Sequence, residues 1–350
     1  MLNKDIQKLF FSGSVLTLAG LISGALGYVY QILIGRLLGP EDFSTVATVT
    51  SIYLICASPL TAITLIFARQ ASKNIAIGRE SLVPHTFYIW VRKAIRIAVF
   101  SATISILFLL LADYFLKARF LFFGCTIIVL VATAAFFHLT TGYFQGCLQF
   151  RTMASLGLFQ VFLKLFLSTM LIVLGFGVAG ALVGLALSAV AVQAVCLFII
   201  YRQIEMTAPS YKLEPEGFQK TSSKTDILKE FMPVVAASLA ITLFTQLDVI
   251  IAKLVFSAEK AGEYTAASVL AKTLLYLPSG FVQSMYPMIA RKFSVNQSDK
   301  PIIVATLLLV LVSGSLACLI FYLFSFEIVE LFFGNSYAGT GTILKFLPIA

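Results

Sequence analysis

The sequence predicts an all-α integral membrane protein, and three observations support that class. Of its 350 residues, 59% are hydrophobic and only 12% are charged, which lies far outside the range of soluble globular domains. Residues 120–150 and 165–201 contain no Asp, Glu, Lys or Arg at all. Lipid offers no partner for an unpaired N–H or C=O, so a helix of about twenty apolar residues is needed for each crossing. The third observation is a duplicated two-helix unit, described below.

Nine membrane spans follow from the apolar stretches. They are expected near residues 10–35, 43–67, 92–112, 120–141, 155–174, 178–200, 231–256, 263–289 and 302–324. A polar turn around Glu41 separates the first two spans, and Gly175-Phe176-Gly177 marks the turn between the fifth and sixth, because the uncharged stretch there is too long for one helix. A tenth span is expected to open near Thr340. We expect the natural protein to continue beyond Ala350, where the sequence stops inside an apolar pattern.

A hydrophilic segment divides the spans into two groups. Residues 202–230 contain Pro209, Pro215, Gly217 and a mixture of lysine and glutamate, which is typical of a linker. We therefore predict an N-terminal lobe of six spans over residues 1–201. The cytoplasmic linker over 202–230 follows, and then the start of a C-terminal lobe over 231–350, with about four spans.

The two-helix unit occurs once in each predicted lobe, at Ile34–Ser72 and at Ile251–Ser294. The shared features, in order, are a cation (Arg36, Lys253), an acidic turn (Glu41, Glu259), an aromatic residue (Phe43, Tyr264), an internal proline (Pro59, Pro278) and an Ala-Arg exit (Ala68-Arg69, Ala290-Arg291). Duplicated helical units are typical of transporters built from two halves. Because proline bends a helix, Pro59 and Pro278 are candidate hinges, with a static kink as the alternative.

The distribution of lysine and arginine predicts the orientation. Roughly seventeen of the loop cations fall on one side of the predicted spans and roughly five on the other. The excess of cations marks the cytoplasmic side, so we expect a multi-pass protein of the cell (inner) membrane with a cytoplasmic N-terminus. Basic loops facing anionic lipid also account for the net charge of +9 without a nucleic-acid partner.

Catalytic and metal chemistry find no support in the sequence. The five cysteines lie in or beside spans without paired spacing, and His85 and His138 have no ligand-type neighbour at metal-binding spacing. No phosphate-binding glycine loop, nucleophile elbow or paired-carboxylate motif is present. We therefore expect no metal site and no catalytic residue.

Ionisable residues within the predicted spans are the first candidates for a substrate pathway, because charge inside a membrane is costly. Lys164 lies in the fifth span, Asp248 in the seventh and Lys272 in the eighth. Each could instead reach the interface or form a structural ion pair, and Asp248 could pair with Lys253 or Lys272. The weaker polar candidates for the cavity are Gln31, Gln145, Gln160 and Gln246, together with Arg36, for which interfacial anchoring is the alternative.

The repeated loops carry a resemblance to a known family. The stretch GRLLGPEDF at Gly35–Phe43 resembles the first-loop signature of Wzx-type polysaccharide biosynthesis/export proteins, which flip lipid-linked oligosaccharides and belong to the superfamily of the MATE exporters. SAEKAGEYTAAS at Ser257–Ser268 is similar to the corresponding signature of the second lobe, with Ser257-Ala258 in place of Gly39-Pro40. FQG at Phe144–Gly146 and GFGVAGALVG at Gly175–Gly184 also match, and the resemblance covers essentially the whole chain.

The resemblance implies two six-helix lobes related by a pseudo-twofold axis, with about twelve to fourteen spans in the family. It implies alternating access that carries an undecaprenyl-diphosphate-linked glycan, or a similar polyprenyl lipid, from the cytoplasmic to the outer leaflet. Lys164 and Lys272 would then face the diphosphate and the amides the sugars. No cofactor is expected, and coupling to Na⁺ or H⁺ and contact with polysaccharide assembly proteins stay open.

Three alternative functions remain open. An ion-coupled multidrug exporter would use Asp248 as its cation site, although the intramembrane carboxylates are few. A membrane-embedded polymerase or glycosyltransferase would need catalytic acids or a large outer loop. A structural membrane subunit would leave the duplication unexplained.

Overall fold

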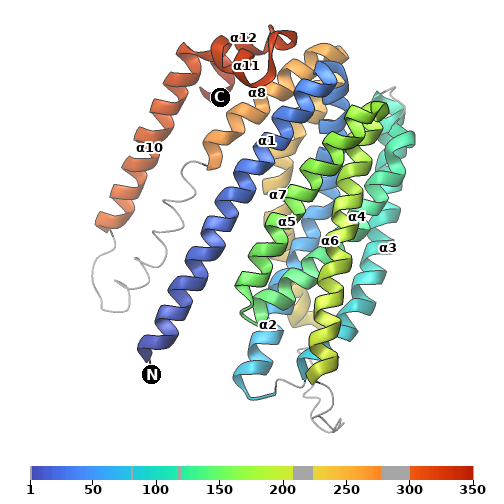
Figure 1. Cartoon of the computed structure of the whole chain (residues 1–350), viewed down its shortest axis with the longest axis vertical. Coiled ribbons are helices and arrows are strands. Elements are labelled where there is room, and N and C mark those ends of the chain that lie inside the picture. Colours follow the sequence, from blue (N-terminus) through green and yellow to red (C-terminus); the bar gives the residue numbers. More distant parts are fainter. Residues whose placement is uncertain (1, 80–81, 117–119, 208–223, 277–299, 350) are drawn as a thin grey trace. The chain divides into compact units, whose positions relative to one another are not determined.

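The computed structural model describes residues 2–79, 82–116, 120–207, 224–276 and 300–349, and this part of the chain is built from helices without a strand (Figure 1). The longer helices are α1 (Leu2–Ala57), α2 (Thr61–Ala76), α3 (Leu82–Leu116), α4 (Phe120–Gly146), α5 (Phe150–Leu171), α6 (Gly177–Thr207), α7 (Lys224–Val255), α8 (Ala258–Tyr276), α10 (Lys300–Leu323), α11 (Ser325–Phe333) and α12 (Thr340–Phe346). The predicted all-helical class is confirmed.

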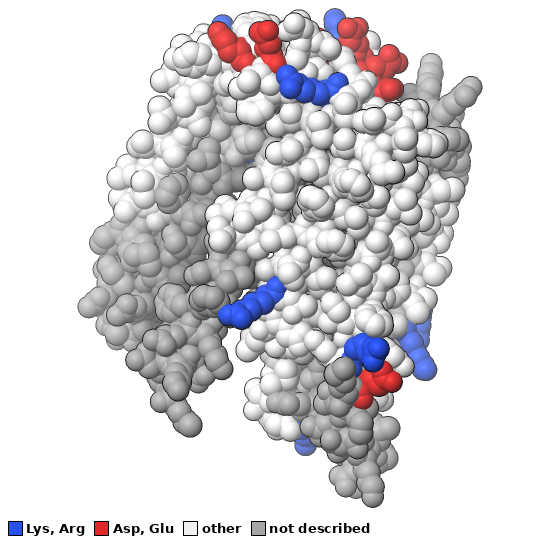
Figure 2. Space-filling view, in the orientation of Figure 1, with Lys and Arg blue, Asp and Glu red and all other residues white. Residues whose placement is uncertain are grey.

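Five helical stretches among the described residues are long and apolar enough to cross a membrane. They are Leu18–Ala76, Phe123–Gly146, Phe150–Glu205, Phe231–Val255 and Ile303–Leu323. The first and third of these are 59 and 56 residues long, and each contains two of the predicted spans. On the face shown in Figure 2, charged side chains gather toward the helix ends and leave an almost uncharged band between them.

The breaks between predicted spans have local causes in the backbone. The predicted turn between the first two spans corresponds to a kink inside α1, where Gly39 adopts φ 76° and ψ 172°. This left-handed conformation favours glycine, and the following Pro40 has no N–H to continue the helical ladder. The predicted turn at 175–177 is confirmed, since Gly175 (φ 92°) and Gly177 (φ 50°) both have positive φ. At Pro59 the chain forms a short 3₁₀ turn, Ser58–Leu60, between α1 and α2.

The C-terminal part differs from the prediction in one respect. A helix begins at Thr340 as expected, but α11 precedes it and was not predicted. The nine residues of α11 are mostly apolar but too few for a span, and they include Glu327 and Glu330. Pro278 lies outside the described residues, as does the end of the predicted eighth span.

The chain forms two compact units. The first contains Met1–Tyr30 and Val46–Leu254, and the second contains Gln31–Thr45 and Val255–Ala350. In the first unit, α3 to α6 run beside one another, and α2 packs against α4 (Figure 1). The lobes predicted on either side of the hydrophilic segment 202–230 do not coincide with these units, and they stay a prediction.

Glycine permits close helix packing inside the first unit. A Cβ at Gly184 of α6 would lie 2.5 Å from the Ser168 backbone of α5, and one at Gly142 of α4 would lie 2.9 Å from the Thr64 carbonyl of α2. The Ser168 hydroxyl donates a hydrogen bond to the Ala181 carbonyl across the same interface (3.0 Å). Small residues that let backbones approach are the usual means of association between helices in lipid, where hydrophobic burial contributes little.

The second unit brings both repeated signature loops together. Gly262 of α8 lies so close to the Pro40 backbone that any side chain there would clash with it. Phe43 stacks in a buried cluster with Phe333 and Tyr337, at centroid distances of 5.8 and 6.4 Å. The Tyr337 hydroxyl donates to the Gly35 carbonyl (2.8 Å). The first-loop signature therefore forms part of the core of this unit.

Candidate binding site in the first unit

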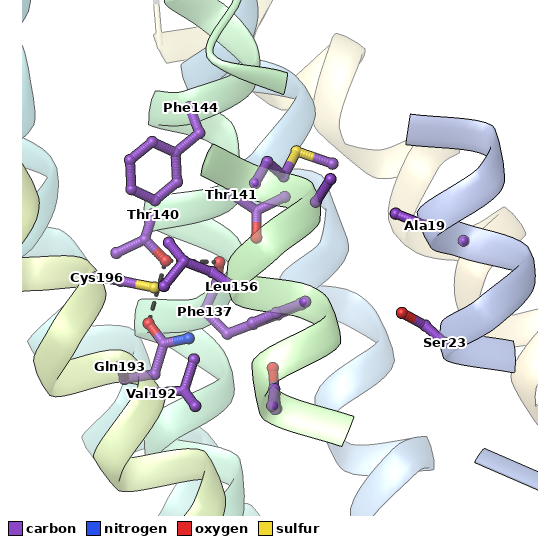
Figure 3. A pocket seen from close by; sticks show the side chains of 15 residues that line it. Ala19, Ser23, Phe137, Thr140, Thr141, Phe144, Leu156, Val192, Gln193 and Cys196 are labelled. Carbon is purple, nitrogen blue, oxygen red and sulfur yellow. Dashed lines mark hydrogen bonds between the residues drawn. The ribbon is translucent and has the colours of Figure 1, made fainter. Parts of the chain in front are cut away.

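A cavity of about 180 Å³ lies between α1, α4, α5 and α6 of the first unit. Figure 3 shows Ala19 and Ser23 of α1 on one side of it and the side chains of α4 to α6 on the other. The polar lining residues are Ser23, Thr140, Thr141, Gln160 and Gln193, and the aromatic ones are Phe137 and Phe144. No charged side chain belongs to this lining.

One buried amide dominates the polar chemistry of the cavity. Gln193 of α6 is 5% exposed, and its side-chain oxygen accepts a hydrogen bond from the Thr140 hydroxyl of α4 (3.1 Å). That hydroxyl also lies 3.1 Å from the Phe137 carbonyl, so its single proton is shared between two acceptors. Figure 3 shows the amide nitrogen of Gln193 turned away from Thr140, toward the other lining residues. This nitrogen forms no hydrogen bond within the described part of the chain.

Lys164 lies one helical turn beyond Gln160 on α5, a rise of about 6 Å along the helix axis. Its side chain is half-buried, and its Nζ lies 4.2 Å from the centroid of the Tyr30 ring of α1. Lys164 forms no ion pair with any described residue. The aromatic face attracts the ammonium but does not neutralise it, so a net positive charge remains on α5, one turn from the cavity-lining Gln160.

Tyr30 is held firmly beneath this ammonium. It is 4% exposed, and its hydroxyl is buried near Ser168. The Ser168 proton is committed to the Ala181 carbonyl, and no hydrogen bond of good geometry joins the two hydroxyls. Tyr30 is therefore held by burial and not by a hydrogen bond of its hydroxyl, with its ring face against the Lys164 ammonium.

The structure brings Gln160 and Lys164 together on one face of α5 and places the other predicted amides elsewhere. Gln246 of α7 accepts a hydrogen bond from the Ser51 hydroxyl of α1 (3.0 Å), a contact that joins two helices of the first unit. Gln145 is half-buried near the end of α4 and does not line the cavity. Asp248 is half-buried in α7, also in the first unit.

The remaining candidates belong to the second unit. Arg36 is exposed, and its guanidinium lies 3.5 Å from the Glu330 carbonyl. Gln31 is half-buried in α1, and Lys272 is half-buried in α8. Both Asp248 and Lys272 have interaction partners, so neither side chain is isolated. No group of three His, Cys, Asp or Glu residues in the described ranges is arranged to hold a metal ion.

Sequence reasoning missed Tyr30, Thr140 and Gln193. Gln193 carried a usable signal, since it is the one amide in the apolar run 178–200. Nothing in the sequence pairs Tyr30 with Lys164, which lie far apart along the chain. The sequence does not distinguish Thr140 from other threonines in apolar helices, because its contact with Gln193 is a tertiary one.

The chain resembles known proteins over most of its length. The family model described as polysaccharide biosynthesis protein matches residues 11–293. A solved structure of a multidrug resistance MATE family transporter of the MOP superfamily, in an inward-facing conformation, is similar with a TM-score of 0.63 at 17% identity, over 93% of this chain and 77% of that one. No curated protein matches the chain.

Two further solved structures show the same fold. A MOP superfamily transporter from Pyrococcus furiosus, described as having a binding pocket of reverse polarity, is similar with a TM-score of 0.54 at 18% identity, over 97% of this chain and 78% of that one. A mutant of a MATE transporter from Vibrio cholerae is similar with a TM-score of 0.54 at 15% identity, over 98% and 79%.

Proposed function

Because the chain belongs to the polysaccharide biosynthesis protein family, we propose that it flips a polyprenyl-diphosphate-linked glycan from the cytoplasmic to the outer leaflet of the cell membrane. It is a membrane transporter of the MOP superfamily and not an enzyme. The substrate, the direction of transport and the cytoplasmic N-terminus belong to the proposal, as do coupling to Na⁺ or H⁺ and contact with polysaccharide assembly proteins.

The half-buried ammonium of Lys164 is the observation that carries this proposal. A cation inside an apolar helix is costly, and the Lys164 ammonium lies 4.2 Å from the centroid of the Tyr30 ring without an ion-pair partner among the described residues. In a medium of low dielectric constant, such a charge strongly favours an incoming anion. A lipid-linked diphosphate supplies two or more negative charges, which cannot cross hydrocarbon without a compensating partner. Lys272, in the second unit, is proposed as a further substrate-binding cation.

Replacement of these lysines tests the proposal in cells. We expect Lys164→Ala or Lys272→Ala to abolish surface polysaccharide export in a strain that depends on this protein. Loss of one charge-assisted contact weakens phosphate binding by about 1.5–3 kcal/mol, which is roughly tenfold or more. Lys164→Arg keeps the charge and should retain part of the export. Immunoblots of membrane fractions verify that every variant is inserted.

Wild-type export by both alanine variants, at equal protein levels, would remove the two lysines from the mechanism. Export lost equally in Lys164→Ala and Lys164→Arg would point instead to a role of Lys164 in packing.

A second candidate, an ion-coupled multidrug exporter, is favoured by the likeness of the fold to MATE transporters. The Lys164 cation, one turn from a cavity with uncharged lining residues, disfavours the multidrug exporter, because an exporter of cationic drugs needs acidic groups in its site. Expression in a drug-sensitive strain separates the two candidates. A flippase should confer no resistance, whereas resistance that is lost in Asp248→Asn would favour the exporter.

A further inference from the structure

The cavity beside Lys164 has the chemistry of a site for a neutral, hydroxyl-bearing ring. We propose that it holds the sugar attached directly to the diphosphate, with the Gln193 amide as hydrogen-bond partner and Phe137 and Phe144 as apolar walls. This inference rests on the proposed function, since it assigns a subsite for that substrate. A cavity of about 180 Å³ is large enough to receive one sugar ring.

The lining excludes the charged and the purely apolar parts of the substrate. None of the lining residues is charged, so a phosphate group inside the cavity would lose its hydration without gaining a counter-charge. A lipid tail would leave the Gln193 amide buried without a partner, at a cost comparable to a lost hydrogen bond. A sugar ring meets both demands, because its hydroxyls bind the amide while its C–H faces pack on aromatic side chains.

The orientation of the amide makes a hydroxyl the best-matched group. One polar atom of the Gln193 amide hydrogen-bonds with Thr140, and the other faces the cavity. The amide oxygen and nitrogen can exchange places by a flip, so the atom that faces the cavity is a donor in one orientation and an acceptor in the other. A sugar hydroxyl both donates and accepts, and it satisfies either arrangement. The Thr141 hydroxyl also points toward the cavity in Figure 3.

The spacing along α5 connects this subsite to the cation. Gln160 lines the cavity, and Lys164 follows one turn later, about 6 Å further along the helix axis. The first sugar of a lipid-linked glycan is bonded to the phosphate itself, so two subsites for these groups must be adjacent. A diphosphate at Lys164 would therefore place its attached sugar at the level of Gln160 and Gln193.

Binding of two lipids that differ only in the sugar tests the assignment. Purified protein in nanodiscs is titrated with a polyprenyl diphosphate that carries one N-acetylglucosamine, and in parallel with the same polyprenyl diphosphate without sugar. Gln193→Leu should weaken binding of the sugar-bearing lipid by about two- to tenfold, the loss of one neutral hydrogen bond, and leave the sugar-free lipid unchanged. Thr141→Val, which keeps the side-chain shape, should act in the same direction and does not break the Thr140–Gln193 contact.

A matched control lies on the same helix. Gln203 of α6 pairs with Gln149 (3.2 Å) and does not line the cavity, so Gln203→Leu should bind both lipids as the wild type does. The sugar assignment is overturned if Gln193→Leu and Thr141→Val bind the sugar-bearing lipid with wild-type affinity, as for a cavity filled only by water. It is also overturned if they weaken both lipids equally.

The Lys164→Met variant shows whether a negative result contradicts this inference or the proposed function. That variant should lose affinity for both lipids, because both carry the diphosphate. Unchanged binding of both lipids by Lys164→Met would contradict the anion site, whereas the preference for the sugar-bearing lipid reports on Gln193 alone.

Discussion

Replacement of Gly184 by alanine should destabilise the protein, because α5 and α6 touch backbone to backbone at this residue. A Cβ at Gly184 would lie 2.5 Å from both the Cα and the amide nitrogen of Ser168. Ordinary contact begins at 3.4 Å, so the helices would have to separate by about 0.9 Å. The obstructing atoms are backbone, which cannot rotate away as a long side chain can.

The expected cost combines three contributions. Overpacking of a dense interface costs about 1–3 kcal/mol. Separation also lengthens the bond from Ser168 to the Ala181 carbonyl, now 3.0 Å, whose loss costs about 1 kcal/mol. Alanine is the better helix former by about 1 kcal/mol, which offsets part of the loss. We expect a net destabilisation of about 1–3 kcal/mol.

Thermal or detergent-induced unfolding of the purified protein measures this effect, with Gly24→Ala as the matched control. Gly24 lies in α1, where a Cβ meets nothing within 4 Å, so alanine there should stabilise the protein by about 0.5–1 kcal/mol. Both substitutions replace glycine by alanine, but they should change the free energy of unfolding in opposite directions. A Gly184→Ala variant as stable as Gly24→Ala would refute the close approach of α5 and α6.

Two further predictions concern single hydrogen bonds. The bond from the Tyr337 hydroxyl to Gly35 contributes about 1 kcal/mol at neutral pH, and burial raises the pKa of this hydroxyl above its usual value of about 10. Above about pH 10 the phenol ionises in the unfolded chain while the folded protein keeps it protonated, so the stabilisation decreases as the pH rises toward the raised pKa. Tyr337→Phe should therefore lower the unfolding temperature at pH 7, and the difference from wild type should shrink above pH 10; a difference independent of pH would contradict this. Ser51→Ala and Gln246→Leu should each cost about 1 kcal/mol, and the double variant should cost no more than either, because both remove the same bond. Additive costs in unfolding would show that the side chains do not interact.

Part of the fold could be predicted because it depends on local chemistry. The turn at Gly175–Gly177 was predictable from two glycines inside an apolar stretch too long for one helix, and both adopt positive φ. The break at Pro59 follows from the missing N–H of proline. The turn between the first two spans was predictable in the same way, and it lies at Gly39, where a positive φ and the following Pro40 interrupt the helix.

The site was less accessible to sequence reasoning, because its contacts join distant residues. Lys164 and Gln160 could be selected as polar residues one turn apart in an apolar helix. The Tyr30 ring that faces the ammonium, and the Thr140 hydroxyl that orients Gln193, depend on how α1, α4, α5 and α6 pack. No periodicity in one helix encodes the neighbour that its side chains will meet.

Transbilayer movement of the lipid in proteoliposomes tests the central claim most directly. The measurement follows a fluorescent polyprenyl-diphosphate glycan with a quencher that reaches only the outer leaflet. We predict that wild-type protein and Lys164→Arg move the lipid across the bilayer, and that Lys164→Met does not. Equal movement with Lys164→Met, or none above protein-free vesicles with the wild type, would contradict a cation-dependent flippase.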